Sequence, residues 1–509
     1  MRHDTTPNDL APNAARAQRE RRMPASDPPS PRLRMVTLLG AVAVLVAGAA
    51  LLPGCIILDG TSLGSSAGSG SSSGTSTPPV HHLPQPSIWR VDLPVLDADA
   101  QKRLAEVEQY LWDHYQAAGW QILDTTQTFL GDIYDWMDPA SVQGSHEQPP
   151  SPPTPTEMLL PVGVLLQKTE LDAFPELRGR AGTIPVLRPS FAAYVLGLSG
   201  ATSLDDFLTK YVVPGAPPTA YDPNRLYAGM VSRVDNQGAN ATINSYYGLI
   251  EPGSMSVLEM TVGCRNAQDQ MWQWVGIASS RDWATQGFAN FGDFVLRLQV
   301  EFLTAGAGAV GNGIGGWAGT KSVTDFIPYE KAPYGPGAAF LPQMISTVGG
   351  PQYESLYQIK LLNGNWWVGH NGYWLGYYPG KLFGEGPSNL LASKACEVQW
   401  YGEVYANLVK TWGIWTYTDM GSGRFASEGW LNAAYFRDPS YVSLDAAGTW
   451  SWPPGDPKIT SDITANLSND KCYTKTALGS GPAPWEQFFY VGGPGREIGN
   501  QCQGPIPPP

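Results

Sequence analysis

The stretch from Gly364 to Phe383, GNWWVGHNGYWLGYYPGKLF, combines three Trp and three Tyr with one Lys and one His. Flat aromatic faces bind sugar rings and proline rings through apolar contact, and the same side chains are common in protein cores. If the stretch is a β-hairpin, alternate residues face opposite sides, so one set packs inward and the other lines a groove or faces solvent. We expect a ligand to contact Trp366, Trp374, Tyr377 and the more distant Trp400.

Two other kinds of site lack support in the sequence. The six His occur without an HExxH motif or paired-Cys spacing, so we expect neither a metal nor another cofactor. Gly421-Ser422-Gly423 indicates a turn, but it lacks the strand-to-helix context of a serine nucleophile.

Short apolar runs separated by Gly, Asn and Pro predict many strands from Tyr227 onward. Asn363-Gly364 and Asn371-Gly372 are typical of tight hairpin turns. These features favour a mainly β fold built as an antiparallel sandwich. Upstream, apolar residues at helical spacing predict a helix over 97–118, capped by Asp97, within a smaller α+β region.

The N-terminus has the pattern of an export signal. An apolar run from Val36 to Leu52 follows basic residues and ends in Leu52-Pro53-Gly54-Cys55, which resembles a bacterial lipobox with Cys55 as the lipidated residue. A plain signal peptide or an anchoring helix is the alternative. The Gly/Ser/Pro-rich residues that follow predict a flexible tether. We therefore expect an extracytoplasmic protein, either lipid-anchored to a membrane or secreted.

Charge and cysteine content agree with this location. The net charge of -13, without clustered Lys and Arg, argues against a nucleic-acid partner. Beyond Cys55, four Cys remain and allow three pairings; we favour Cys472 with Cys502, which leaves Cys264 with Cys396.

Several separated segments together resemble the neprosin family of secreted glutamic peptidases that cut after proline. In chain order they are Gly131-Asp132-Ile133-Tyr134-Asp135, Arg188-Pro189-Ser190, Tyr227-Ala228-Gly229, 239–244, Gly364-Asn365-Trp366-Trp367, 376–383, Gln399-Trp400-Tyr401-Gly402-Glu403-Val404, 420–423 and 428–437. The resemblance implies a pro-region followed by a catalytic β-sandwich, with the Trp-rich hairpin near the substrate groove. It also implies that the pro-region blocks the cleft until it is cleaved, near Pro214 to Arg225.

The family's chemistry implies two glutamates around one water molecule, one ionised as base and one protonated as acid. The second glutamate matches Glu403. At the position of the first, the ungapped register places Gln273, whereas matching Trp272 to the family's Trp places Asp269; we favour Gln273. Glutamine cannot exchange a proton, so this register implies impaired catalysis. Glu259, Glu301 and Glu428 are alternatives that could substitute for the first glutamate, but we interpret each as structural or solvent-facing. The family's short Cys-containing loop is missing after Thr304-Ala305-Gly306.

The sequence thus predicts a monomer with a signal peptide and lipobox over 1–55, a tether over 56–87, a pro-region over 88–223, a sandwich over 224–445 and a C-terminal extension over 446–509. Its predicted activity is acid-acting cleavage after proline in peptide or protein substrates. The alternative is a non-catalytic module that binds Pro-rich peptides or glycans through its aromatic cleft, and a glycosidase comes third.

Overall fold

The computed structural model describes residues 83–86, 95–143, 152–153, 158–189, 191–197, 199–208, 225–251, 254–265, 272–282, 295–305, 326–406, 417–444, 450–451 and 472–495. All of these belong to one structural unit, which spans residues 52–509. Cys55, Asp269, Cys502 and the predicted boundary near Pro214 lie outside the described residues.

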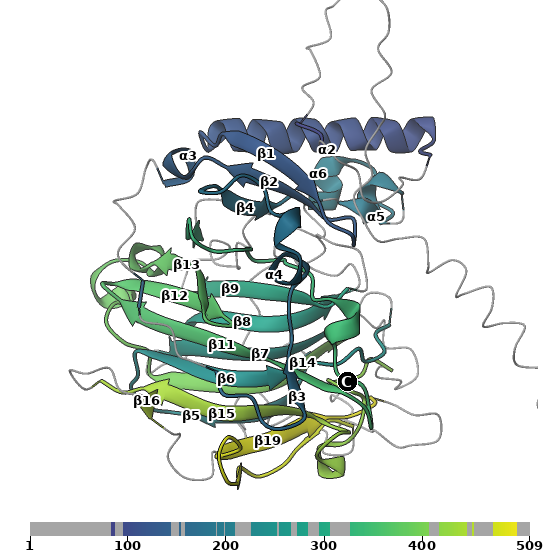
Figure 1. Ribbon diagram of the computed structural model, residues 1–509. Coiled ribbons are helices and arrows are strands. Elements are labelled where there is room, and N and C mark those ends of the chain that lie inside the picture. Colours follow the sequence, from purple (N-terminus) through teal and green to yellow (C-terminus); the bar gives the residue numbers. More distant parts are fainter. Residues whose placement is uncertain are drawn as a thin grey trace, which may run out of the picture. The chain divides into compact units, whose positions relative to one another are not determined.

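The N-terminal part is a small α+β arrangement, as predicted. Helix α2 (Ala98–Ala117) begins where the Asp97 side chain accepts a hydrogen bond from the Ala100 backbone N–H. It lies along a three-stranded antiparallel sheet of β1 (Ile122–Gln127), β2 (Ile133–Met137) and β4 (Ile184–Leu187), and its apolar side shares a core with that sheet (Figure 1). The short helices are α3 (Pro139–Gln143), α4 (Glu170–Ala173), α5 (Ala192–Val195) and α6 (Leu204–Phe207).

A buried ion pair holds this three-stranded sheet together. Arg188 donates from Nε to the Asp135 carboxylate at 2.9 Å, and Thr125 Oγ1 donates to the same carboxylate at 3.0 Å. Arg188 also donates to the Pro84 carbonyl at 2.8 Å. The two N-terminal segments that carry the resemblance therefore meet in one charge-assisted contact.

The first large sheet has five antiparallel strands in the order β5-β14-β7-β8-β9. Their bounds are β5 (Arg225–Ser232), β14 (Glu397–Ala406), β7 (Ser254–Arg265), β8 (Trp272–Asp282) and β9 (Arg297–Ala305). The pairing is in continuous register across all five strands. Side chains therefore form straight rows that face alternately to one side and the other.

The second large sheet has eleven strands and includes the Trp-rich hairpin. Its main path is β10 (Ile327–Pro328), β13 (Tyr373–Pro379), β12 (Asn365–His370), β11 (Gln352–Leu362), β6 (Gly238–Asn244), β15 (Ala434–Val442), β19 (Gln487–Gly492) and β17 (Thr474–Lys475). Strands β3 (Val164–Leu166), β16 (Trp450–Ser451) and β18 (Gly479–Ser480) pair beside this path, and β3 runs parallel to β11. Both predicted turns form, with positive φ at Asn363, Gly364, Asn371 and Gly372.

The two large sheets lie as two layers (Figure 1) and share one hydrophobic core. The first sheet contributes residues such as Met260, Ile277 and Trp400, and the second contributes residues such as Ile243 and Trp366. The predicted mainly β, antiparallel sandwich is therefore confirmed. Its core fixes which side of each strand is left for function.

One predicted disulfide is present. Cys264 and Cys396 join β7 to the start of β14 with their Cα atoms 4.9 Å apart. Cys472 is also disulfide-bonded. Its predicted partner, Cys502, lies outside the described residues.

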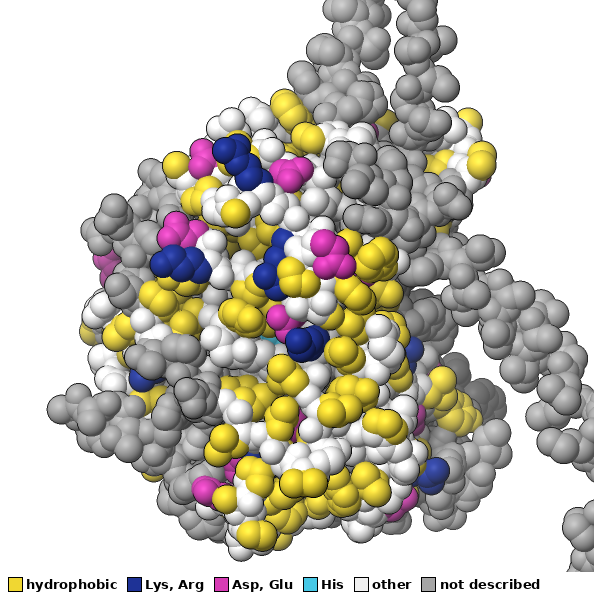
Figure 2. All heavy atoms as spheres, viewed as in Figure 1, with side chains coloured by type: hydrophobic (Ala, Val, Ile, Leu, Met, Phe, Trp, Pro, Cys, Tyr) yellow, Lys and Arg dark blue, Asp and Glu magenta, His cyan; other side chains and the backbone are white. Residues whose placement is uncertain are grey.

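Charged side chains are dispersed on the face shown in Figure 2. Lys and Arg lie singly there, beside acidic side chains and between hydrophobic ones. Among the described helices, none is long and apolar enough to cross a membrane.

Candidate active site

Three glutamates lie on the side of the five-stranded sheet that faces away from the main core. In β14, Val398, Trp400 and Val404 pack in the core, so Glu403 faces the other way. Tyr401, two residues earlier on this same side, is in register with Glu259 of β7, and Glu301 of β9 is in register with Gly276 of β8. We call this side the carboxylate face. Glu259, Glu301 and Glu403 are only 2%, 8% and 4% exposed.

Glu259 and Glu301 interact across the intervening strand β8. Burial raises the pKa of Glu259 well above its usual value, and the Glu301 charge and the hydrogen bond between the two carboxyls raise it further. Burial also raises the pKa of Glu301, although the hydrogen bond from Glu259 opposes this shift. These shifts favour the protonated form of Glu259 more strongly than that of Glu301. Tyr401 donates to Glu259 Oε2 at 2.6 Å, and Gln299 donates to Glu301 Oε2 at 3.2 Å.

Gly276 makes this contact between carboxyls sterically feasible. A Cβ atom built on Gly276 would lie 2.4 Å from Glu259 Oε1, which is closer than nonbonded atoms can approach. The Glu259 side chain therefore occupies the space that a side chain on β8 would fill. Since Gly276 is directly in register with Glu301, this space lies between the two carboxyl groups.

Glu403 lies beside this pair and carries its own counter-ion. Arg225 of β5 donates to Glu403 Oε1 in a salt bridge, and the Glu403 charge contributes to the raised pKa of both Glu259 and Glu301. Arg225 also lies over the Tyr405 ring, 5.5 Å from its centroid. The arrangement thus pairs an ion-paired carboxylate with a protonated carboxyl, which are the two states that acid–base catalysis needs.

The structure does not bring Gln273 to Glu403. Gln273 lies in β8 beside Val275 and Ile277, on the core side of the sheet, in register with Cys264. Its side-chain amide donates to the carbonyls of Phe383 and Ser388 at 2.8 and 2.9 Å and accepts from the Leu390 N–H at 2.8 Å. The residue anchors the 383–390 segment, and the competing candidate Asp269 lies outside the described residues.

The four aromatic residues predicted to contact a ligand divide into two groups. Trp366 and Trp400 are fully buried in the main core, where their indole N–H groups donate to Leu391 and Asn240 carbonyls. Trp374 and Tyr377 belong instead to a separate cluster with Trp367 and Ile327, against which Tyr329 and Leu362 pack. We call this cluster the aromatic face. Because this cluster is separate from the main core, its residues lie on the side of the β12–β13 hairpin that faces away from that core.

N-terminal residues contact the carboxylate face through one buried ion pair. Arg297 is in register with Ser280, which in turn pairs with Val257 and so with the row of Glu403. Arg297 Nη1 and Nη2 donate to the two Asp132 carboxylate oxygens at 2.8 and 2.9 Å, and Nη1 also donates to the Gly337 carbonyl at 3.0 Å. This bidentate geometry fixes the start of β2 beside the face.

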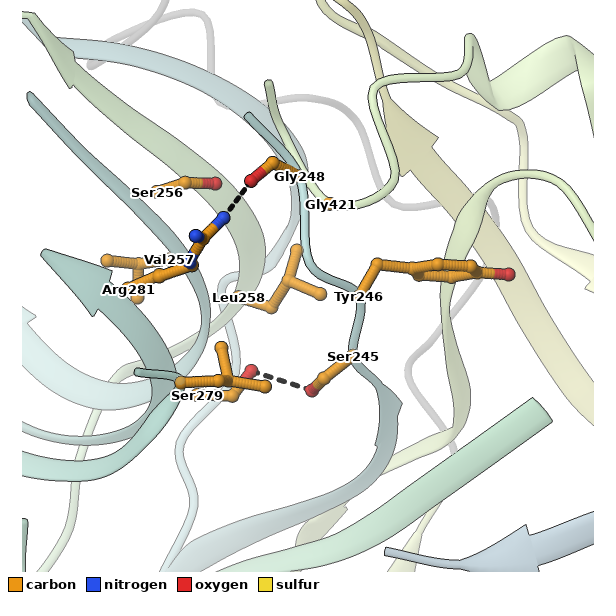
Figure 3. A pocket seen from close by; sticks show the side chains of 10 residues that line it. Ser245, Tyr246, Gly248, Ser256, Val257, Leu258, Ser279, Arg281 and Gly421 are labelled. Carbon is orange, nitrogen blue, oxygen red and sulfur yellow. Dashed lines mark hydrogen bonds between the residues drawn. The ribbon is translucent and has the colours of Figure 1, made fainter. Parts of the chain in front are cut away.

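A small pocket lies near one end of the sandwich but does not reach the three glutamates (Figure 3). Ser245, Ser279 and Leu258 line it; Ser245 Oγ and Ser279 Oγ are 2.8 Å apart, and Arg281 donates to the Gly248 carbonyl. It has room for about one water molecule. The pocket is therefore too small to hold an organic ligand.

Sequence reasoning considered Glu259 and Glu301 only as less favoured substitutes, and it did not predict that Arg225 and Gly276 lie beside these glutamates. A usable signal was present, because 258–262 and 298–302 each alternate between core and polar residues, which puts both glutamates on the polar side. Their relation to Glu403 depends on strand order and register, which alternation alone does not give. Among the described residues, no group of three or more His, Cys, Asp or Glu side chains could hold a metal ion.

Comparisons with known proteins found a family model and solved structures that resemble this chain. The Neprosin family model matches residues 322–494. Among solved structures, scytalido-glutamic peptidase with a peptide-based transition-state analogue is 9% identical and covers 53% of this chain and 97% of its own, with a TM-score of 0.24. An eqolisin-family peptidase in complex with the tripeptide Ala-Ile-His is 8% identical, with the same two coverages and a TM-score of 0.22. At these TM-scores the two likenesses carry no part of the argument below.

Proposed function

We propose that the chain is an acid-acting glutamic endopeptidase that cleaves after proline, starting from the match of residues 322–494 to the Neprosin family model. The observation that carries the proposal is the gathering of Glu259, Glu301 and Glu403 on one side of one sheet. Glu403 lies within the matched residues, and its two partners lie on strands that precede them.

In the proposed reaction, Glu403 is the base and Glu259 is the acid. Glu403 takes a proton from a water molecule while the water oxygen attacks the carbonyl carbon of the scissile bond. Glu259 gives its proton to the carbonyl oxygen, and the resulting tetrahedral intermediate breaks its C–N bond as the leaving nitrogen takes the proton held by Glu403. The carbonyl re-forms and returns the other proton to Glu259, so both carboxyls end as they began.

The surroundings of each glutamate suit its role. The Arg225 guanidinium favours the ionised form of Glu403, whereas burial and the nearby carboxylates favour the protonated form of Glu259. Glu301 is a positioning residue, because it holds the Glu259 proton by a hydrogen bond between turnovers. Raising the pH past the raised pKa of Glu259 removes the acid, so we expect activity to fall as the pH rises through that pKa.

We further propose that residues 88–223 act as a pro-region. The Asp132–Arg297 ion pair supports this role, because it ties N-terminal residues to the sheet side that carries the three glutamates. The glutamates are almost fully buried, so a peptide reaches them only after the covering residues move. Export, lipidation at Cys55 and maturation near Pro214 to Arg225 belong to the same proposal.

The test is hydrolysis of a Pro-containing peptide in acid by the full chain after limited proteolysis. Glu403→Gln and Glu259→Gln should each lower kcat by about 10²- to 10⁴-fold, the range of one general acid or base. Glu385→Gln is a matched control, because Glu385 is exposed in the same domain. Unchanged turnover in Glu403→Gln would remove the assignment. An inactive wild-type chain that still binds the peptide would favour a non-catalytic binding module.

A further inference from the structure

The aromatic face is already in contact with a proline-rich segment of the chain. Trp374 Nε1 donates to the Pro153 carbonyl at 2.6 Å, although the two residues are 221 positions apart. Pro153 is buried and Pro152 is half-buried. Both prolines belong to the sequence QPPSPPTP at 148–155, in which five of eight residues are Pro.

The chemistry of the aromatic face suits a polyproline II segment. The rings of Trp367 and Tyr377 are 4.8 Å apart, and Trp374 lies at a steep angle to Trp367, with 6.3 Å between centroids. Tyr329 packs edge-on against Trp367. A polyproline II helix has no internal hydrogen bonds, so its carbonyls need outside donors while its rings need flat apolar partners. Aromatic grooves with such donors are the common receptors for PxxP segments.

A second donor on the aromatic face supports a ligand longer than two residues. Trp367 is fully buried, and its Nε1 has no hydrogen-bond partner within the part of the chain that the structure describes. A buried N–H without a partner costs free energy, and a second backbone carbonyl would satisfy it. Two indole donors on neighbouring strands match a ligand that presents carbonyls along its length.

We propose that the aromatic face is a binding site for proline-rich peptides in the polyproline II conformation, filled in cis by Pro152 and Pro153. The site is separate from the carboxylate face and does not require hydrolysis, so it goes beyond the proposed function. A proline-rich partner in trans must compete with the tethered segment. Because a tethered segment competes at an effective concentration in the millimolar range, the intact chain binds such a partner poorly.

The experiment uses a fluorescent synthetic QPPSPPTP peptide and the full chain carrying Glu403→Gln, so that the peptide stays intact. Fluorescence anisotropy should show at least about tenfold tighter binding after Pro152→Gly and Pro153→Gly are introduced together, because the tethered competitor is lost. Adding Trp374→Phe should weaken this binding by about tenfold, since the ring is kept and one hydrogen bond is lost. A peptide with Ala in place of every Pro should not bind.

A matched control is Trp430→Phe, because Trp430 is a partly exposed Trp outside the aromatic face, beside Tyr435 and Trp485. It should leave peptide affinity unchanged. Near-UV circular dichroism checks that each variant keeps its tertiary packing. The proposal is overturned if the double-glycine chain binds no better than its parent, or if Trp374→Phe and Trp430→Phe have equal effects. Neither result bears on whether Glu403 and Glu259 catalyse hydrolysis.

Discussion

The carboxylate face and the aromatic face lie on different sheets of the same sandwich and use opposite chemistry. The carboxylate face gathers Glu259, Glu301 and Glu403 with hydrogen-bonded partners and one Arg counter-ion. The aromatic face gathers Trp367, Trp374 and Tyr377 without a charged group among its members. Each is touched by N-terminal residues, through the Asp132–Arg297 ion pair in one case and through Pro153 in the other.

The position of a side chain along its strand, rather than the local composition, decides which of the two faces it joins. Trp366 and Trp367 are adjacent in β12, yet one is a core residue and the other belongs to the aromatic face. Gln273 and Trp274 are adjacent in β8, so they face opposite sides of the sheet, and Gln273 faces the core. A shift of one residue moves a side chain to the other side of a sheet.

The largest expected effect concerns the N-terminal contact with the carboxylate face. Asp132→Asn leaves the buried Arg297 without its counter-ion, so we expect the free energy of unfolding to fall by about 3 to 5 kcal/mol. Denaturation in urea measures the loss. The same substitution at Asp172, whose contact with the half-exposed Arg178 is 3.9 Å long, should cost less than about 1 kcal/mol. Equal losses in the two variants would mean that the buried pair adds nothing specific.

The next effect tests the two sides of β8. Gln273→Glu replaces a donor to two carbonyls by a carboxylate on the core side, so we expect a loss of about 3 kcal/mol at neutral pH and no gain in hydrolysis. Thermal unfolding and peptide cleavage measure both outcomes. Gln116→Glu is the control, because Gln116 is exposed on α2. A gain in kcat from Gln273→Glu would return this residue to the active site and contradict the register.

The sequence was a good guide to the elements and a poor one to the partners of Glu403. Asp97 as helix cap and the two Asn-Gly turns depend on local backbone chemistry, which neighbouring residues determine. The Glu259–Glu301 contact depends on β8 lying between β7 and β9 and on Gly276 leaving space there. Such facts come from long-range pairing. Similarity to a short family segment predicted that Gln273 lies beside Glu403. That match compared residue types along the chain and held no information on strand register, which decides the side of the sheet that a residue faces.

A third expected effect is a pH dependence of stability that comes from Glu170, whose pKa is raised in part by Asp132. Burial raises the pKa of Glu170 to about 7, with a further contribution from Asp132. Because this pKa is higher in the folded state than its ordinary value of 4.5, Glu170 favours folding below about pH 4.5 and loses that contribution as the pH rises to about 7. Glu170→Gln should therefore flatten the stability profile over this range, by about 3 kcal/mol.

Urea denaturation at several pH values measures this profile. The Pro153–Trp374 contact joins a backbone carbonyl to an indole N–H, and neither group titrates in this range. We therefore expect the Trp374 indole N–H to keep the same protection against hydrogen exchange, corrected for the intrinsic exchange rate, at each pH in the wild type and in Glu170→Gln. An unchanged slope in Glu170→Gln would show that another group controls stability in this range.

The smallest effect on folding, and the sharpest test of the carboxylate face, is expected from Gly276→Ala. The added Cβ would lie 2.4 Å from the end of Glu259 and 3.0 and 3.1 Å from the side chains of Trp274 and Thr261, with none of these atoms in the backbone, so the carboxyl is displaced while the sheet is kept. We expect stability to change by less than about 1 kcal/mol and kcat to fall by about tenfold, because the acid is misplaced. In the Glu259→Gln background the same substitution should lower kcat no further, since the group that it displaces no longer carries the proton. If the losses in kcat from Gly276→Ala and Glu259→Gln add, Gly276 acts on something other than the Glu259 carboxyl, and the assignment of Glu259 as the acid would then fail.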